Sequence, residues 1–132
     1  MRRILLGLGA LLTMMDATAP EAQETVRTGD FTFGGVTRAY RLVVPATLPV
    51  PGERSLVVLL HGCTQDAADL ARGTRIDAHA AALGVAVLMP EQASTAHPQR
   101  CWNWYDPAHA GRDAGEAALI AELARVVADS LA

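Results

Sequence analysis

The residues best suited to chemistry in this sequence are His61, Gly62 and Cys63, which follow directly on the apolar run at 56–60. A glycine at the end of a strand lets the backbone turn tightly and lets a ligand approach it. The backbone N–H groups of such a turn, directly after a strand, can point at the negatively charged oxygen that develops in acyl transfer. Removal of one such donor lowers the rate by about a hundredfold or more. A plain strand-to-helix turn is the alternative, but the position directly after an apolar strand favours an oxyanion loop.

A second candidate is the aromatic segment at 100–105, which holds both tryptophans of the chain and one of its two tyrosines. Aromatic side chains on a loop often form a binding wall, because they combine a large contact area with a polar group. For Trp102 and Trp104 two interpretations stay open, a substrate wall and a plug at the end of the core. Asn103 is interpreted as a local turn former and not as a ligand.

The chain has two cysteines, Cys63 and Cys101, and neither belongs to a C-x-x-C pair. This spacing argues against a zinc site and against thioredoxin-like chemistry. One disulfide is the natural interpretation in a secreted protein, and two free thiols in a cytosolic one.

The N-terminus indicates secretion. Arg2 and Arg3 precede an apolar run at 4–15, and small residues follow up to Ala22. A charged start, a short apolar run and an A-x-A site are typical of a signal peptide. We therefore predict a signal peptide over 1–22 and a secreted protein, extracellular or periplasmic, without a stable membrane span. A short cytosolic leader, or a true start at position 14 or 15, is the alternative.

Composition excludes several other functions. The 132 residues suffice for one domain, and a hydrophobic fraction of 51% supports a packed core. The net charge is −3, and no basic stripe interleaved with aromatic residues is present, so nucleic-acid binding has little support. The sequence does not indicate an oligomeric state.

The elements that must position these residues follow an α/β order. Gly34-Gly35 predicts a tight turn within a hairpin over 31–44. The continuous apolar runs at 56–60 and 85–89 predict parallel strands buried on both faces, and one of the two should leave a hydrophobic edge exposed. A helix is predicted between them from the spacing of Ile76, Ala80 and Leu83, with its end at Gly84.

A loop is predicted over 90–111, and a second helix follows it to the end of the sequence. Asp113 is predicted to cap this helix, with Glu116 three residues on. The predicted apolar face is Leu119, Ile120, Leu123, Val126 and Val127, and the predicted solvent face is Glu122, Arg125 and Asp129.

Three segments together resemble the polyhydroxybutyrate (PHB) depolymerase-like esterases, which are α/β-hydrolases grouped with feruloyl and acetylxylan esterases. They are HGCTQD through PEQ at 61–92, RCWNWYDP at 100–107 and a G-x-x-A-L-I-A-type helix start, and the resemblance covers roughly 29–132. It implies an α/β-hydrolase-type sheet that begins with a β-hairpin followed by parallel βαβα. It also implies hydrolysis of a polyester or plant-type ester by acyl transfer, without a metal or an organic cofactor.

The resemblance assigns roles to individual residues. Cys63 matches the oxyanion position through its backbone N–H, and His61 and Gly62 shape that loop. Trp102 and Trp104 match the aromatic loop near the substrate cleft. Cys63 and Cys101 match the two family cysteines, which implies a disulfide that ties the two loops together.

The nucleophile of the family stands in a G-x-S-x-G elbow, followed by the acid and the histidine. No serine of this sequence has that context, so we expect residues 23–132 to be the N-terminal part of an esterase domain, truncated before the elbow and inactive alone. The alternatives are a small secreted module that binds polymer or ester without hydrolysis, and complementation by a separately encoded second half. We expect structural roles for Ser55, Ser94 and Ser130, no base role for His79, His97 or His109, and turn or cap roles for Asp66, Asp69 and Asp106.

Overall fold

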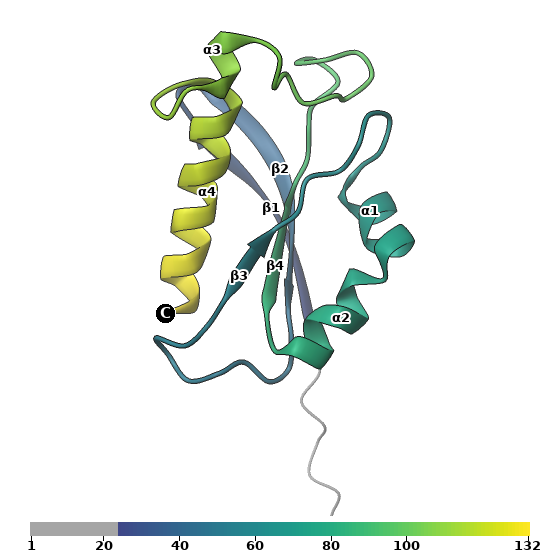
Figure 1. The fold of residues 1–132 in the computed structure, drawn as a ribbon, viewed down its shortest axis with the longest axis vertical. Coiled ribbons are helices and arrows are strands. Elements are labelled where there is room, and N and C mark those ends of the chain that lie inside the picture. The colour runs from purple at the N-terminus through teal and green to yellow at the C-terminus, as the bar shows by residue number, and fades with distance from the viewer. Residues whose placement is uncertain (1–23) are drawn as a thin grey trace, which may run out of the picture.

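The computed structural model describes residues 24–132, and the predicted signal peptide over 1–22 lies outside this range. A mixed sheet stands between two helical layers, with α4 on one face and α1 and α2 on the other (Figure 1). The elements in chain order are β1 Thr25–Phe33, β2 Val36–Val44, β3 Leu56–Val58, α1 Ala67–Thr74, α2 Ile76–Leu83, β4 Ala86–Pro90, α3 Pro107–Ala110 and α4 Gly115–Leu131.

The predicted hairpin is confirmed. β1 and β2 pair antiparallel from Thr25↔Val44 to Phe33↔Val36. Both turn glycines have positive φ, 59° at Gly34 and 78° at Gly35, as a two-residue turn of this type requires. β1 begins at Thr25 and not at 31, because its first residues pair through the backbone while their side chains remain mostly exposed.

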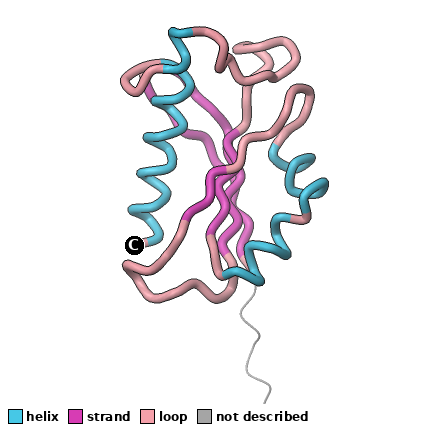
Figure 2. Tube along the Cα trace, viewed as in Figure 1, coloured by secondary structure: helices cyan, strands magenta, loops and turns pink. Residues whose placement is uncertain are grey.

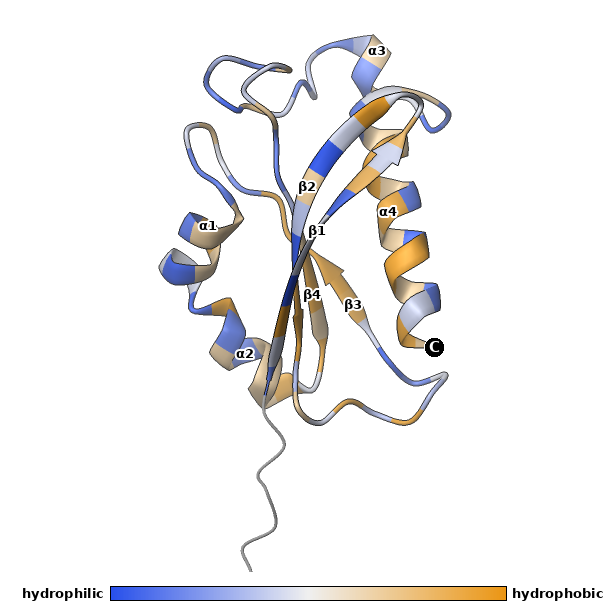
Figure 3. Cartoon of the chain, turned by 180° about the vertical axis from the view of Figure 1, so that it is seen from behind, coloured by the Kyte–Doolittle hydropathy of each residue, from blue (hydrophilic) through white to orange (hydrophobic). Residues whose placement is uncertain are grey.

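The strand order is β1-β2-β4-β3, with β4 antiparallel to β2 and parallel to β3. All five residues of β4 are buried, as its continuous apolar run predicts. The same prediction is wrong for β3, since Val57 is 41% exposed. The reason is that β3 is an edge strand among the described residues, so the expected exposed hydrophobic edge falls here. Figure 3 shows β3 and β4 as apolar and β2 as alternating.

Two helices, where one was predicted, connect β3 to β4. α1 is capped by Asp66, whose Oδ1 accepts from the amide of Asp69 at 2.8 Å. Arg75, with a φ of 53°, separates α1 from α2, and Gly84, with a φ of 64°, ends α2 as predicted. The helix predicted from the spacing of Ile76, Ala80 and Leu83 is present as α2, in which Ala80 is buried and Leu83 is 72% exposed.

α4 follows the prediction except at its start. It begins at Gly115, and its N-cap Ala114 makes no side-chain bond, so the predicted Asp113 cap is wrong. Gly115 has a φ of 72°, and a Cβ there would collide with the carbonyl oxygen of Ala108 in α3. Buried α4 residues are Glu116, Ala118, Leu119, Leu123, Val127 and Leu131, whereas Val126 is 40% exposed and Ile120 is half-buried.

The predicted solvent face of α4 carries ion pairs. Arg125 donates to Glu122 at 2.6 Å and to Asp129 at 2.7 Å. The predicted loop over 90–111 contains the short helix α3, so His109 lies in a helix and not in a loop. Across residues 24–132, no helix combines the length and the apolar character that crossing a bilayer requires.

Candidate active site

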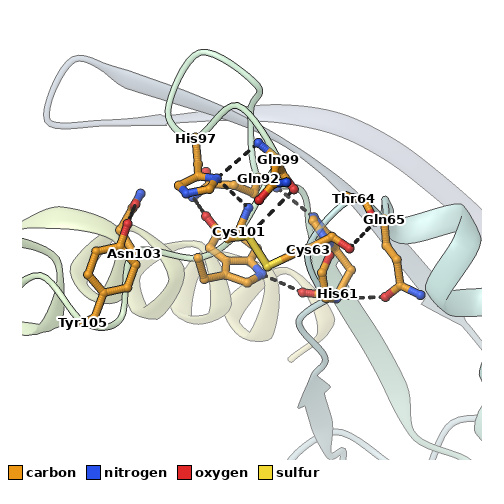
Figure 4. Close-up of a disulfide and its surroundings, with 12 residues drawn as sticks. His61, Cys63, Thr64, Gln65, Gln92, His97, Gln99, Cys101, Asn103 and Tyr105 are labelled. Carbon is orange, nitrogen blue, oxygen red and sulfur yellow. Dashed lines mark hydrogen bonds between the residues drawn. A yellow bond between two sulfur atoms is a disulfide. The ribbon is translucent and has the colours of Figure 1, made fainter.

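Two loops meet at one end of the sheet. Because β3 and β4 run parallel, their carboxyl ends lie at the same edge, where α/β proteins place ligand sites. Figure 2 shows the loops after these strands side by side at that end. We call residues 61–66 the oxyanion loop, after the role that the sequence predicts for them, and residues 100–105 the aromatic loop. A disulfide between Cys63 and Cys101 joins them, with a Cα–Cα distance of 4.3 Å (Figure 4).

His61 is buried and held on both ring nitrogens. Its Nε2 lies 3.0 Å from the backbone nitrogen of Gln92, and its Nδ1 lies 2.8 Å from the carbonyl oxygen of Gly62. A backbone amide can only donate, so Nε2 is the acceptor and Nδ1 must carry the proton. The hydrogen bonds therefore assign His61 as a neutral ring whose Nδ1–H donates to Gly62.

The Gly62 carbonyl fixes the direction of the next amide. It accepts from His61 and also from the amide of Gln65 at 3.3 Å. A trans peptide is planar, with its C=O and N–H pointing in opposite directions. The Cys63 N–H is therefore directed away from His61, and no residue among 24–132 accepts a hydrogen bond from it. A fixed and unpaired N–H of this kind can donate to a negatively charged oxygen.

The two tryptophans differ in their surroundings. Trp102 is half-buried, its Nε1 donates to the carbonyl oxygen of His61 at 3.0 Å, and its ring lies 5.5 Å from the imidazole. Trp104 is 80% exposed and packs edge-on against Tyr105. Trp104 therefore does not plug the core of the described residues.

A groove of about 400 Å³ starts at Leu60, next to His61, and runs between β3 and α4. Its walls are mainly apolar, and both tryptophans take part in them. The groove residues are Val58, Leu60, Trp102, Trp104, His109, Ala110, Glu116, Ala117, Ile120, Ala121 and Ala124. An apolar ligand fits such walls, and Leu60 in them directly precedes the loop that carries Cys63.

Behind both loops lies a buried polar cluster, formed by Arg38, Gln92, Asn103 and Glu116, that sequence reasoning missed. Gln92 uses its whole side-chain amide. Its Oε1 accepts from Arg38 Nε at 3.0 Å and from the Ala93 amide at 3.1 Å. Its Nε2 donates to the carbonyl oxygen of Cys101 at 3.0 Å and to Glu116.

Glu116 is 6% exposed and accepts from the backbone amide and the side-chain amide of Asn103, each at 2.7 Å. Arg38 lies 3.9 Å from its carboxylate. Burial raises the pKa of Glu116, but the hydrogen bonds from Gln92 and Asn103, together with the charge of His109, outweigh burial and hold that pKa below its usual value.

Asn103 has two roles, of which the sequence indicated one. Its carbonyl oxygen accepts from the amide of Asp106 at 3.0 Å, so the turn role is confirmed. Its side chain also anchors the aromatic loop to Glu116 in α4. In the sequence, Glu116 was explained by a local capping pattern with Asp113. For that reason no contact between Glu116 and residues distant in sequence was predicted.

Of the other histidines and aspartates considered in the sequence, His109 lines the groove, and the rest make local contacts. His79 is exposed on α2, and His97 accepts through Nδ1 from the amides of Gln99 and Cys101. The cap roles are confirmed for Asp66 in α1 and Asp106 in α3, and Asp69 pairs with Arg72 in α1. Ser130 hydrogen-bonds the carbonyl oxygen of Val127 in α4.

Comparison with known proteins shows the family of this chain. Residues 38–131 match the family model described as esterase PHB depolymerase. Poly(3-hydroxyalkanoate) depolymerase C from Paucimonas lemoignei is 38% identical over 79 residues, which cover 56% of this chain and 18% of that protein.

One solved structure supports the fold. The S-formylglutathione hydrolase FrmB from Staphylococcus aureus superposes with a TM-score of 0.57 at 19% identity, over 80% of this chain and 41% of that one. A ferulic acid esterase overlaps with a TM-score of 0.42 at 19% identity, over 56% of this chain and 32% of that one. The chain thus spans less than half the length of each of these proteins. The predicted α/β-hydrolase class is confirmed, and the chain belongs to the PHB depolymerase esterase family.

Proposed function

We propose that this chain is the oxyanion-loop part of a secreted serine esterase that hydrolyses carboxylic esters. The observation that carries the proposal is the Cys63 N–H, which His61 and Gly62 orient and which donates to no described residue. Family membership supplies the reaction class. The proposed domain spans 23–132 and continues in a segment that carries the nucleophile.

In the proposed reaction a serine attacks the ester carbonyl, a histidine takes its proton, and the Cys63 N–H donates to the tetrahedral oxyanion. The acyl-enzyme then yields the acid to water. The role of His61 is to hold the Gly62 carbonyl and not to move a proton, because both of its nitrogens are engaged. Ser55 precedes β3 and Ser130 ends α4, so both lie away from the carboxyl ends of β3 and β4.

For the substrate, we propose an ester with an apolar acyl part, a polyester in particular. The apolar groove next to Leu60 and the exposed indole of Trp104 suit such a chain. The poly(3-hydroxyalkanoate) depolymerase relative supports the polyester over a plant-type ester. Secretion is supported by the leader pattern at 1–22 and by the Cys63–Cys101 disulfide, since disulfides persist in oxidising compartments.

The test combines the gene and its product. Translation of the genomic sequence around these codons should show a G-x-S-x-G segment followed by an aspartate and a histidine. The complete product should hydrolyse p-nitrophenyl esters and react with a fluorophosphonate probe. A product that binds PHB film without hydrolysis or probe labelling would instead establish the non-catalytic binding module, which the exposure of Trp104 also favours.

A further inference from the structure

Glu116 stands at the point where three parts of the fold meet. It lies in the first turn of α4, and it is 6% exposed. Its carboxylate accepts from two groups of Asn103 in the aromatic loop and from Gln92 after β4. A carboxylate buried with three donors and a nearby guanidinium is satisfied only while it remains an acceptor.

Two routes lead from Glu116 to His61. In the first, the Gln92 side chain bonds Glu116, and the Gln92 backbone amide donates to His61 Nε2 at 3.0 Å. In the second, Asn103 bonds Glu116, and its neighbour Trp102 donates to the His61 carbonyl oxygen at 3.0 Å. The ring of His61 is thus held by Gln92, which bonds Glu116, and its carbonyl oxygen by Trp102, the neighbour of Asn103.

We propose that Glu116 is a positioning residue for the oxyanion donor, acting through Gln92 and Asn103 on His61 and thereby on the Cys63 N–H. The catalytic consequence rests on the proposed esterase function, whereas the effect on the loop geometry does not. Glu116 touches neither the substrate nor the reacting atoms. It fixes the peptide plane that would present the N–H to the oxyanion.

The contacts demand a carboxylate at this position. A glutamine would turn its NH2 group toward Asn103 or toward the Gln92 amide, so that a donor would face a donor. The exchange Glu116→Gln with Gln92→Glu keeps one carboxylate and one amide in contact. It loses the donor that Gln92 gives to the Cys101 carbonyl and the acceptor that Glu116 Oε1 gives to the side-chain amide of Asn103.

The test uses NMR of the protein labelled with 15N-tryptophan and 15N-cysteine. Trp102 and Cys63 report on the two routes, and the exposed indole of Trp104 is a reference in the same spectrum. In E116Q we expect the Trp102 indole and Cys63 amide signals to shift or broaden, and the Trp104 indole signal to stay in place. Glu122→Gln is the matched control, because it is the same substitution on the exposed face of the same helix and should move neither signal.

The E116Q/Q92E double variant should return the Cys63 amide signal part of the way to its wild-type position, because it restores the contact between the side chains at positions 92 and 116. An E116Q protein that melts at a lower temperature with both signals unmoved would overturn the proposal, because Glu116 would then stabilise the fold without positioning the loop. A double variant whose Cys63 amide signal is displaced further than in E116Q would also contradict it.

If E116Q does not fold, the proposal is tested by following the NMR signals of the wild-type protein during an acid titration. The titratable and charged groups around Glu116 are Arg38 from β2, His109 from α3 and Asp113, which line a cavity together with Glu116. We expect the Trp102 indole signal to move together with the 13C signal of the Glu116 carboxyl group. A Trp102 signal that stays fixed while Glu116 titrates would refute the proposal. None of these spectra depends on ester hydrolysis, so this proposal and the proposed function can fail separately.

Discussion

The Nε2 atom of His61 accepts a hydrogen bond of 3.0 Å from the backbone amide of Gln92. This bond joins the segment after β3 to the segment after β4, at the edge where the two parallel strands end. It also settles the tautomer of His61 and, through Nδ1, the orientation of the Gly62–Cys63 peptide. The oxyanion loop is therefore held from the neighbouring strand and not by its own sequence alone.

Replacement of His61 by alanine should destabilise the protein. The change leaves the buried amide of Gln92 without an acceptor, which costs about 1–3 kcal/mol. Urea unfolding measures the loss, and His79→Ala on the exposed face of α2 is the control, expected within about 0.5 kcal/mol of wild type. Equal stability of the two variants would mean that the His61 bonds contribute nothing net.

Reduction of the disulfide should lower stability by about 3–4 kcal/mol in the chain-entropy model, given a sequence separation of 38. The melting temperature of the wild-type protein should fall in the presence of a reductant. The C63A/C101A variant should melt at that lower temperature with and without the reductant. A wild-type melting temperature that does not respond to full reduction of the cysteines would contradict this account.

The stability of the protein should depend on the ionisation of Glu116. Its pKa is lowered from the ordinary value of 4.5, so the unfolded chain takes up this proton at a higher pH than the folded protein does. The contribution is fully present above 4.5 and is lost as the pH falls through the lower folded pKa. Unfolding free energies of wild type and E116Q, measured across this range, should therefore converge toward acid. A constant difference between them would exclude a role for the Glu116 charge.

The sequence predicted the structural features that depend only on residues adjacent along the chain. Gly34-Gly35, Gly84 and the Asp66 cap were identified because a positive φ or a side-chain cap leaves a local pattern. Glu116 was not identified, because its partners Gln92 and Asn103 are brought to it only by the packing of α4. A capping pattern with Asp113 offered a local explanation that tertiary contacts override.

The exposure of β3 shows a similar limit. The continuous apolar run at 56–60 is typical of a central strand, and it does not reveal which strand stands at the edge of a sheet. Val57 is exposed because β4, and not β3, took the central position beside β2. For the candidate site, the His61–Cys63 segment was found from its place after a strand, whereas the hydrogen bonds that orient it were not.

Substitutions of the two tryptophans should affect different properties, adsorption to polymer for Trp104 and the free energy of unfolding for Trp102. Trp104→Ala should change stability by less than about 0.5 kcal/mol, because the side chain is 80% exposed, and it should weaken adsorption to PHB film. Trp102→Phe should lose about 1 kcal/mol, because it removes the indole N–H bond to His61. Film adsorption and urea unfolding of both variants check this. Undiminished adsorption by Trp104→Ala would remove this residue from the proposed substrate wall.

The most direct test of the central claim is the Cys63 amide in a complex that mimics the tetrahedral intermediate. The complete gene product would be labelled with 15N-cysteine and treated with a phosphonate inhibitor that forms a covalent adduct on the catalytic serine. We expect the Cys63 amide proton to move downfield and to become protected from exchange with solvent, because its N–H then donates to the phosphonyl oxygen. A Cys63 amide signal unchanged by complete formation of the adduct would show that this N–H is not the oxyanion donor.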